Sequence, residues 1–430
     1  MSKTPRQRSG GKPGSKDLHG TVAGALAKHE AWRSETLNLI ASENALSPAV
    51  RSALNNDLLQ RYADYPGRDA NARRYRGNRF IAEIERETAD LAKEVLRAQW
   101  VELRPLAGHL AGLAVILGVC RPHDVVLELG REGGGHREAG RFTASQLVQI
   151  EVMNLPFDAE NYNVDLPAAV KLIEDVRPRL VILGSSNFLF PHPVEGIAAA
   201  LHRSPGAVLA YDASHVMGFL AAASFQDPLR EGADIVFGST HKTFPGPQGG
   251  IILSDREDLI DAASKALVPA LVTNHHPFRM PALALALMEM RTWGRAYVEQ
   301  IVKNSEALGT ALDSRGIPVV CVEGRYSASH TLLLKVSAFG KAEDVALRLE
   351  AAGIITTGTL LPDALGIDGI RIGTQEITRL GAMHPDMLQV ADLISQAIHG
   401  SSPVGRISRA VRQFATSLGP VRFTWGDPQS

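Results

Sequence analysis

The chain has 430 residues, with 45 Lys or Arg against 46 Asp or Glu, so its formal net charge is −1. This balance argues against a protein that binds nucleic acid mainly by electrostatics, because such a protein carries a basic surface. A hydrophobic fraction of 45% and a charged fraction of 21% are typical of a globular chain with a large core, which excludes disorder as the main state. The length suggests two or three domains.

Cys120 and Cys321 are far apart and form no metal-binding spacing, so we expect two buried thiols in a reducing compartment rather than a disulfide or a zinc site. The apolar stretch Leu110–Cys120 is too short to span a bilayer and is read as a buried helix. Residues 1–17 lack the apolar segment of a secretory signal and are expected to form a flexible tail. These features favour a soluble, cytoplasmic enzyme.

Helical periodicity marks the first hundred residues. Three helices are predicted there: Leu18–Trp32, with Leu18, Val22, Leu26 and Ala27 on one apolar face; a helix that begins with the N-cap pair Ser47-Pro48 and runs through Val50, Leu54 and Leu58; and the amphipathic stretch Arg79–Arg97.

Short apolar runs then alternate with helical stretches such as Leu166–Val176 and Val194–His202. The runs predicted to be strands are Val125–Leu129, Leu180–Gly184, Ala207–Asp212, Ile235–Gly238 and Gly250–Leu253. This alternation predicts an α/β fold, in which helices cover both faces of a mainly parallel sheet. The last two strands have only a short connection and are expected to pair in the antiparallel sense.

A long helical stretch, Pro281–Ser314, leads into a smaller α+β region with strand candidates at Thr331–Val336 and Gly369–Ile372. We expect a tail (1–17), an N-terminal arm (18–50), a large domain (51–300) and a small C-terminal domain (301–430). Residues 401–430 are basic and partly helical in pattern, and they suggest no chemical role.

The most informative segment is 233–253, in which a predicted strand runs into Thr240-His241-Lys242 and then a turn rich in Gly and Pro. Side chains at the carboxyl end of a parallel strand face the ligand crevice of an open α/β sheet. Lys242 is therefore a candidate for a Schiff base or a phosphate contact. The alternative is a surface lysine beside a hairpin.

Asp212 ends another predicted strand, and His215 follows three residues later. An aspartate at a strand end can hold a cationic ring nitrogen, and His215 can reach the same ligand. A helix-capping aspartate beside a solvated histidine is the alternative.

Three further segments carry candidate ligand contacts. The loop Gly130–His136 allows close approach of the backbone to a ligand and offers the flat ring of His136, unless it is simply a flexible loop. The segment Arg104–His109 precedes a helix, whose first amides bind anions. Arg371 lies between apolar neighbours, where it suits either a substrate carboxylate or a structural ion pair.

These segments, in this order, resemble serine hydroxymethyltransferases and their relatives among fold-type I pyridoxal-phosphate enzymes. The resemblance covers roughly residues 37–381, and its motifs are Leu39–Asn44, Arg61–Gly67, Asp212–His215, Thr240–Thr243 and Gly369–Thr374. It implies a large, mainly parallel, seven-stranded sheet domain with a smaller α+β domain, and pyridoxal 5′-phosphate as cofactor. It also implies a homodimer with shared active sites, with no metal, nucleic-acid or membrane partner.

The resemblance implies a role for each matching residue. Lys242 would hold the cofactor as an internal aldimine, Asp212 would pair with its pyridine nitrogen, and Arg371 would bind the amino-acid carboxylate. His136 would stack on the cofactor ring, and His215 would lie near its phenolic oxygen. Three further catalytic residues are expected: Tyr62, Tyr75 and Asp64, which stands where the family has a catalytic glutamate. In the family, a tyrosine and this acid come from the neighbouring subunit. The other residues expected around the cofactor are Gly108, His109, Asn187, Thr240 and His241.

The family's chemistry cleaves the Cα–Cβ bond of a β-hydroxy-α-amino acid, threonine or serine, through a glycyl quinonoid, because a protonated pyridine ring is an electron sink. Some departures from the family's pattern fall where it binds folate: Arg131 and Arg137 replace leucines, and Gly358–Pro362 stands in place of an Asn-rich loop. The segments His241–Gln248 and Gly294–Val302 resemble the L-threonine transaldolase branch. We therefore expect a folate-independent transaldolase or aldolase.

Three alternatives stay open on the sequence alone: a serine hydroxymethyltransferase that uses tetrahydrofolate, a cofactor-binding protein without turnover, and a decarboxylase or transaminase sharing Lys242 and Asp212. The acceptor aldehyde is not identified by the sequence. We expect a cationic pocket suited to a phosphorylated or carboxylated acceptor, made by Arg76, Arg131, Arg137 and His275.

Overall fold

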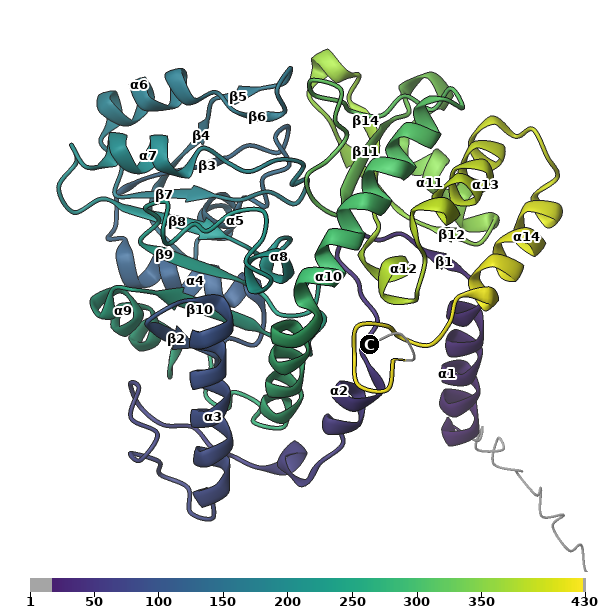
Figure 1. The fold of residues 1–430 in the computed structure, drawn as a ribbon. Coiled ribbons are helices and arrows are strands. Elements are labelled where there is room, and N and C mark those ends of the chain that lie inside the picture. The colour runs from purple at the N-terminus through teal and green to yellow at the C-terminus, as the bar shows by residue number, and fades with distance from the viewer. Residues whose placement is uncertain (1–17, 428–430) are drawn as a thin grey trace, which may run out of the picture.

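The computed structural model describes residues 18–427, so the predicted tail, residues 1–17, lies outside the described residues. Figure 1 shows a larger unit on the left and a smaller one on the right, with the long helix α10 (Arg279–Asp313) running between them. The predicted α/β fold is confirmed. No helix of the part that the structure describes is long and apolar enough to cross a membrane.

A seven-stranded mixed sheet forms the larger unit, in the spatial order β2-β10-β9-β8-β7-β3-β4. Its strands are β2 (Trp100–Glu102), β3 (Val125–Leu129), β4 (Glu151–Leu155), β7 (Leu180–Leu183), β8 (Val208–Asp212), β9 (Ile235–Ser239) and β10 (Gly250–Ser254). The five strands from β9 to β4 pair in parallel, whereas β10 is antiparallel to both of its neighbours. The predicted antiparallel end of the sheet is thus confirmed; β2 and β4 were not predicted.

Both faces of this sheet are covered. Val126 and Phe237 pack into a cluster with residues of α4 and α9, whereas the alternate residues Leu127 and Val236 pack into another with residues of α6, α7, α8 and α10. The helices of the unit are α2 (Pro48–Ala53), α3 (Arg79–Leu96), α4 (Gly108–Val119), α5 (Glu138–Ala144), α6 (Leu166–Val176), α7 (Val194–Leu201), α8 (Met217–Ala221) and α9 (Glu257–Leu267). Strands buried on both sides appear in the sequence as continuous apolar runs.

The smaller unit has its own three-stranded sheet, β11-β14-β13, and its own apolar cluster. The N-terminal arm joins this cluster, because β1 (Leu37–Asn38) pairs in parallel with β12 (Ile354–Ile355). The other elements are β11 (Thr331–Lys335), β13 (Thr357–Leu360), β14 (Asp368–Gly373), α11 (Ala342–Ala351), α12 (Gln375–Arg379), α13 (Met387–His399) and α14 (Val404–Ser417); a separate two-stranded pair joins β5 (Phe157–Asp158) and β6 (Asn163–Val164). Helix α10 contributes to both clusters, and the division at residue 300 stays a prediction.

Two local expectations were wrong, for the end of the second helix and for Cys321. The second helix ends at Ala53 instead of running through Leu58, because the Asn56 side chain caps a new 3-10 helix, Asp57–Gln60. The predicted first helix is present as α1 (Leu18–Ser34), in which Val22 is 68% and Leu26 57% exposed. Cys120 is buried, whereas Cys321 is exposed on the irregular segment between α10 and β11.

The C-terminal segment is held on α10 by a buried ion pair. Arg379 Nη2 lies 2.5 Å from Glu289 Oε2, and both side chains are inaccessible to solvent. Arg379 also donates to the Phe423 carbonyl at 2.9 Å, and Thr424 donates to the other Glu289 oxygen. The pair therefore fastens residues 423–424 to the junction of the two units.

We predict that Arg379→Met lowers the free energy of unfolding by about 3–5 kcal/mol, because it leaves Glu289 buried without its counter-charge. The double variant Arg379→Met/Glu289→Met should lose much less, since no isolated charge remains. Urea denaturation at one fixed protein concentration measures both. A double variant no more stable than Arg379→Met alone would contradict this account.

Candidate active site

Lys242 lies in a tightly held loop just beyond the carboxyl end of β9. Thr240 shapes this loop: its backbone N–H donates to the Gly249 carbonyl at 3.1 Å, and its hydroxyl donates to the Pro247 carbonyl at 2.7 Å. Thr243 donates to the His215 carbonyl at 2.8 Å, which ties the loop to the turn after β8. The Lys242 amine itself has no hydrogen-bond or ion-pair partner among residues 18–427.

The charges nearest to Lys242 come from three separate elements. Burial lowers the pKa of Lys242, the Asp212 and Glu138 carboxylates oppose that lowering, and the Arg371 guanidinium adds to it. A lowered pKa increases the fraction of neutral amine, which is the form that attacks a carbonyl carbon. The arrangement thus suits a lysine that forms a covalent bond with an aldehyde.

Asp212 is the last residue of β8 and His215 lies in the turn that follows, as the sequence predicted. Asp212 is buried, and its Oδ1 accepts the Ser214 N–H at 2.9 Å. The His215 ring stacks on His330, with centroids 5.6 Å apart and an interplanar angle of 14°. Burial lowers the pKa of His215, and the Lys242 and Arg371 charges lower it further, so this imidazole is neutral. His330 was not predicted.

His136 ends a loop that only glycine can form. Gly134 has φ +74°, and a Cβ on Gly135 would lie 1.9 Å from the Leu129 carbonyl oxygen. His136 Nδ1 lies 2.8 Å from Glu138 Oε1, and Arg141 Nη1 lies 2.9 Å from His136 Nε2. The ring is therefore held through both of its nitrogens.

Arg371 reaches from β14 of the smaller unit to the segment after β7. Its Nη1 donates to the Ser186 carbonyl at 2.7 Å, while its Nε is buried without a partner. Burial lowers the pKa of Arg371 to about 10, so the guanidinium is still charged at neutral pH. Asn187 donates to the Tyr162 hydroxyl at 3.3 Å and to the Thr359 hydroxyl at 3.2 Å, and it thereby connects β13 to the same place.

Gly108 and His109 form the first turn of α4, and the N-cap residue Ala107 supplies no side-chain cap. The amides of an uncapped first turn can bind a phosphate. A Cβ on Gly108 would lie 2.4 Å from Ser239 Oγ, so this turn approaches β9 as closely as glycine allows. His241 keeps a buried Nδ1 without a partner, and burial, with the Lys242 charge, lowers its pKa to about 4.

Tyr62, Asp64 and Tyr75 come from the segment between α2 and α3. No described contact links the three to Lys242 or Arg371. Tyr62 is 53% and Tyr75 48% exposed, with ring centroids 5.3 Å apart, and Asp64 Oδ1 is buried without a partner.

The expectation for His275 is corrected. His275 is fully buried and paired with Glu85, which also binds Arg73, so it is not free to line an acceptor pocket. Arg76 and Arg131 are exposed, and Arg137 is half-buried. The sequence could not show this, because His275 and Glu85 are 190 residues apart.

Asn44 is a site residue whose contacts the sequence did not reveal. Its side-chain amide donates to the Lys242 carbonyl at 2.6 Å and to the Tyr297 hydroxyl at 2.9 Å. Gln375 donates to the carbonyls of Ile40 and Glu43, at 2.8 and 2.6 Å. The motif Leu39–Asn44 therefore fastens the N-terminal arm directly to the lysine loop.

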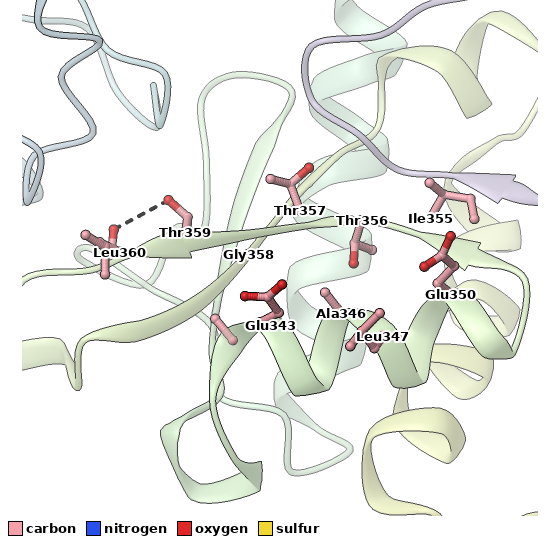
Figure 2. Close-up of a pocket in the computed structure, with 11 residues that line it drawn as sticks. Glu343, Ala346, Leu347, Glu350, Ile355, Thr356, Thr357, Gly358, Thr359 and Leu360 are labelled. Atoms are coloured by element: carbon pink, nitrogen blue, oxygen red, sulfur yellow. Dashed lines mark hydrogen bonds between the residues drawn. The ribbon is translucent and has the colours of Figure 1, made fainter. Parts of the chain in front are cut away.

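Two hollows lie near this region. The first hollow has a volume of about 670 Å³, and its lining includes Asn44, His241 and Arg33 of α1. The second, of about 570 Å³, lies between α11 and β13 and is lined by Glu343, Glu350 and neighbouring threonines (Figure 2). Of the site residues described above, only Thr359, which is bonded to Asn187, lines the second hollow.

The geometry of the site defines the class of enzyme to which the chain belongs. The site combines a half-buried lysine after a parallel strand, an aspartate at the end of the adjacent strand and an arginine from the smaller unit. This is the arrangement of fold-type I pyridoxal-phosphate enzymes. The unpartnered atoms Lys242 Nζ, His241 Nδ1 and Arg371 Nε fit the needs of that cofactor and of a carboxylate substrate.

Comparisons with known proteins identify the family. The family model described as serine hydroxymethyltransferase matches residues 16–394. The chain is 40% identical over 419 residues to the serine hydroxymethyltransferase of Methanopyrus kandleri, covering 96% of each chain, and 38% identical over 421 residues to that of Pyrococcus furiosus, covering 95% and 97%. The solved L-threonine transaldolase of Pseudomonas fluorescens, in its internal aldimine state, superposes with a TM-score of 0.89 at 28% identity, covering 95% of this chain and 94% of that one.

The chain therefore belongs to the serine hydroxymethyltransferase family, and its cofactor is pyridoxal phosphate. The predicted family, fold class and cofactor are confirmed.

One carboxyl group beside the site should titrate unusually. Asn38 donates to Glu376 at 2.6 Å and to Glu43 at 2.9 Å, between the arm and α12. Burial raises the pKa of Glu376 from 4.5 to about 7. Between these pH values, the folded state therefore keeps a proton on Glu376 that the unfolded state has released. The contribution of Glu376 to the free energy of unfolding is thus lost as pH rises from 4.5 towards 7.

We predict that Glu376→Gln removes this dependence, because glutamine does not titrate. The free energy of unfolding of the unmodified protein should fall relative to the variant across the window, by at most about 1.4 kcal/mol per pH unit. Chemical denaturation at several pH values between 4.5 and 7 tests it. Parallel curves for the two proteins would refute the assignment.

Proposed function

We propose that this chain cleaves and re-forms the Cα–Cβ bond of a β-hydroxy-α-amino acid, with threonine as donor, an aldehyde as acceptor and no folate. The observation that carries the proposal is the unpartnered Lys242 amine in the electrostatic field of Asp212 and Arg371. The similarity to a solved L-threonine transaldolase over 95% of the chain supports the transaldolase form.

Each residue has a defined task in this reaction. Lys242 would bond to the cofactor and move protons at Cα, Asp212 would keep a proton on the cofactor's ring nitrogen, and Arg371 would bind the amino-acid carboxylate. By fixing the carboxylate, Arg371 orients the bond that breaks. When bound, pyridoxal phosphate supplies an electron sink for the pair left on Cα.

We propose, more specifically, that no folate takes part in the reaction. The support for this is the short segment Gly358–Pro362, which brings Thr359 to Asn187 beside Arg371, together with the charged residues Arg131 and Arg137 in place of apolar ones. A second candidate is a serine hydroxymethyltransferase that uses tetrahydrofolate. The names of the relatives at 38–40% identity favour that candidate.

We predict that the purified protein, loaded with pyridoxal phosphate, releases acetaldehyde from L-threonine without folate. Added aldehydes should be converted into new β-hydroxy-α-amino acids. Lys242→Ala should abolish both reactions, because it removes the amine on which Asp212 acts, while Lys303→Ala on the exposed side of α10 should change neither.

An acetaldehyde assay coupled to chromatography of the amino acids reads the outcome. Consumption of serine only when tetrahydrofolate is present, with threonine untouched, would establish the second candidate instead.

We also propose a homodimer in which Tyr62 and Asp64 of one subunit complete the site of the other. The exposed rings of Tyr62 and Tyr75, and the exposed apolar residues Val22 and Leu26 of α1, support this, because large apolar groups exposed together mark interaction surfaces. The same arrangement would explain why no described contact within one chain joins Tyr62, Asp64 or Tyr75 to Lys242.

Co-expression of Lys242→Ala and Asp64→Asn chains tests the shared site. Each variant alone should be nearly inactive. The mixed dimer should regain activity, because one of its two sites combines an intact Lys242 with an intact Asp64. If both residues served the same subunit, every site in the mixture would be defective, and no activity would return.

A further inference from the structure

Glu138, the first residue of α5, joins two histidines of the site. It is 3% exposed. Its Oε1 lies 2.8 Å from His136 Nδ1, and its Oε2 is in close contact with His109 Nδ1. The two imidazole rings meet edge to face, with centroids 5.5 Å apart and an interplanar angle of 88°. One buried carboxylate thus connects the first turn of α4 with the loop that ends at His136.

The hydrogen bonds determine where His136 carries its proton. A guanidinium can only donate, so the contact with Arg141 Nη1 at 2.9 Å requires a lone pair on His136 Nε2. A neutral imidazole has one donor and one acceptor, and the proton must therefore lie on Nδ1. There it donates to Glu138 Oε1, which completes a chain from arginine to histidine to carboxylate.

Glu138 is ionised in this setting. Burial opposes its charge, but the hydrogen bond from His136 and the close imidazole of His109 outweigh burial and hold the pKa of Glu138 below its usual value. A carboxylate accepts at both oxygens, so it can serve both imidazoles together.

We propose that Glu138 is a positioning residue that, with Arg141, holds His136 as the neutral Nδ1–H tautomer and fixes its ring plane. This rests on the proposed function and on the role that the family resemblance implies for His136, whose ring would stack on the cofactor ring. Its consequence for the reaction is specific: Arg141 occupies the Nε2 lone pair, so His136 presents a ring face to the cofactor and does not act as the base in bond cleavage.

His109 gives Glu138 a second task. Because His109 belongs to the first turn of α4, the carboxylate links the turn that suits the cofactor's phosphate to the histidine that suits its ring. His109 also packs on Phe142 of α5, with ring centroids 4.5 Å apart. The two contact regions for the cofactor should therefore shift together when Glu138 is changed.

Ligand atoms of His109, His136 and Glu138 lie within 4.8 Å of one another, a spacing that would also suit a metal ion. The positive charges around them favour the hydrogen-bonded arrangement. Arg141 contacts His136 directly, and Lys242 interacts electrostatically with Glu138. A bound divalent cation would displace the Nδ1 proton of His136, so observing that proton distinguishes the two arrangements.

Two-bond ¹H–¹⁵N correlation spectra of the ¹⁵N-histidine-labelled protein, with and without pyridoxal phosphate, read the tautomer directly. His136 is assigned by its loss in His136→Gln. We expect one neutral tautomer with the proton on Nδ1. Arg141→Met, at an exposed position, should allow the Nε2–H form to appear. Glu138→Leu should do the same, whereas Glu138→Gln, which keeps an acceptor of the same shape, should retain most of the Nδ1–H form.

Arg295→Met, at another exposed arginine, is the matched control and should leave the His136 signals unchanged. The steady-state constants should change with the tautomer: in Arg141→Met, kcat should fall by a larger factor than KM rises. A proton on Nε2 or on both nitrogens in the unmodified protein, or signals unchanged in Arg141→Met, would overturn the proposal. So would stoichiometric zinc binding that Glu138→Gln abolishes.

This readout needs no turnover. A His136 protonated on Nδ1 in a protein that leaves threonine intact would refute the proposed function alone. Threonine cleavage with the other tautomer would refute only the role given to Glu138.

Discussion

The structure depends on keeping one lysine amine half-buried without a protein partner. Taking a cationic amine out of water is unfavourable unless it is paired, and the usual response is a lowered pKa. Lys242 shows that response, with Asp212 near enough to act on it electrostatically but not bonded to it. The fold holds the amine by its backbone instead: Asn44 binds the Lys242 carbonyl, and Thr240 and Thr243 fasten the loop on either side.

The site forms only where the two units meet. The larger unit supplies the parallel strands that end at Asp212 and before Lys242, and the smaller unit supplies Arg371 from β14. The N-terminal arm joins them, since it pairs with β12 and also reaches the lysine loop through Asn44. Loosening α10 or the arm would therefore separate the amine from the guanidinium without touching either side chain (Figure 1).

Features encoded by local pattern could be predicted from the sequence. Strands buried on both faces give continuous apolar runs, and polar residues placed where such runs end indicate the crevice, which is why Lys242 and Asp212 were chosen as candidates. Glu138, His330 and the contacts of Asn44 were missed for a different reason. The Asn44 amide meets Lys242 across 198 residues, and His330 meets Ala41 across 289, so only the folded chain brings them together.

The same limitation explains the wrong expectations. His275 looked available in the sequence because nothing local showed that Glu85 would pair with it in the core. Val22 and Leu26 lie on the face of α1 that the periodicity indicated, but both are exposed within one chain. Periodicity predicts that a helix has an apolar side; it does not predict which molecule buries that side.

The most direct test of the central claim is to reduce the protein loaded with pyridoxal phosphate with borohydride, digest it and map the modified peptide by mass spectrometry. The account predicts one pyridoxyl group per chain, attached to Lys242. Cofactor attached to a different lysine, or a protein that binds pyridoxal phosphate without any reducible bond, would contradict it.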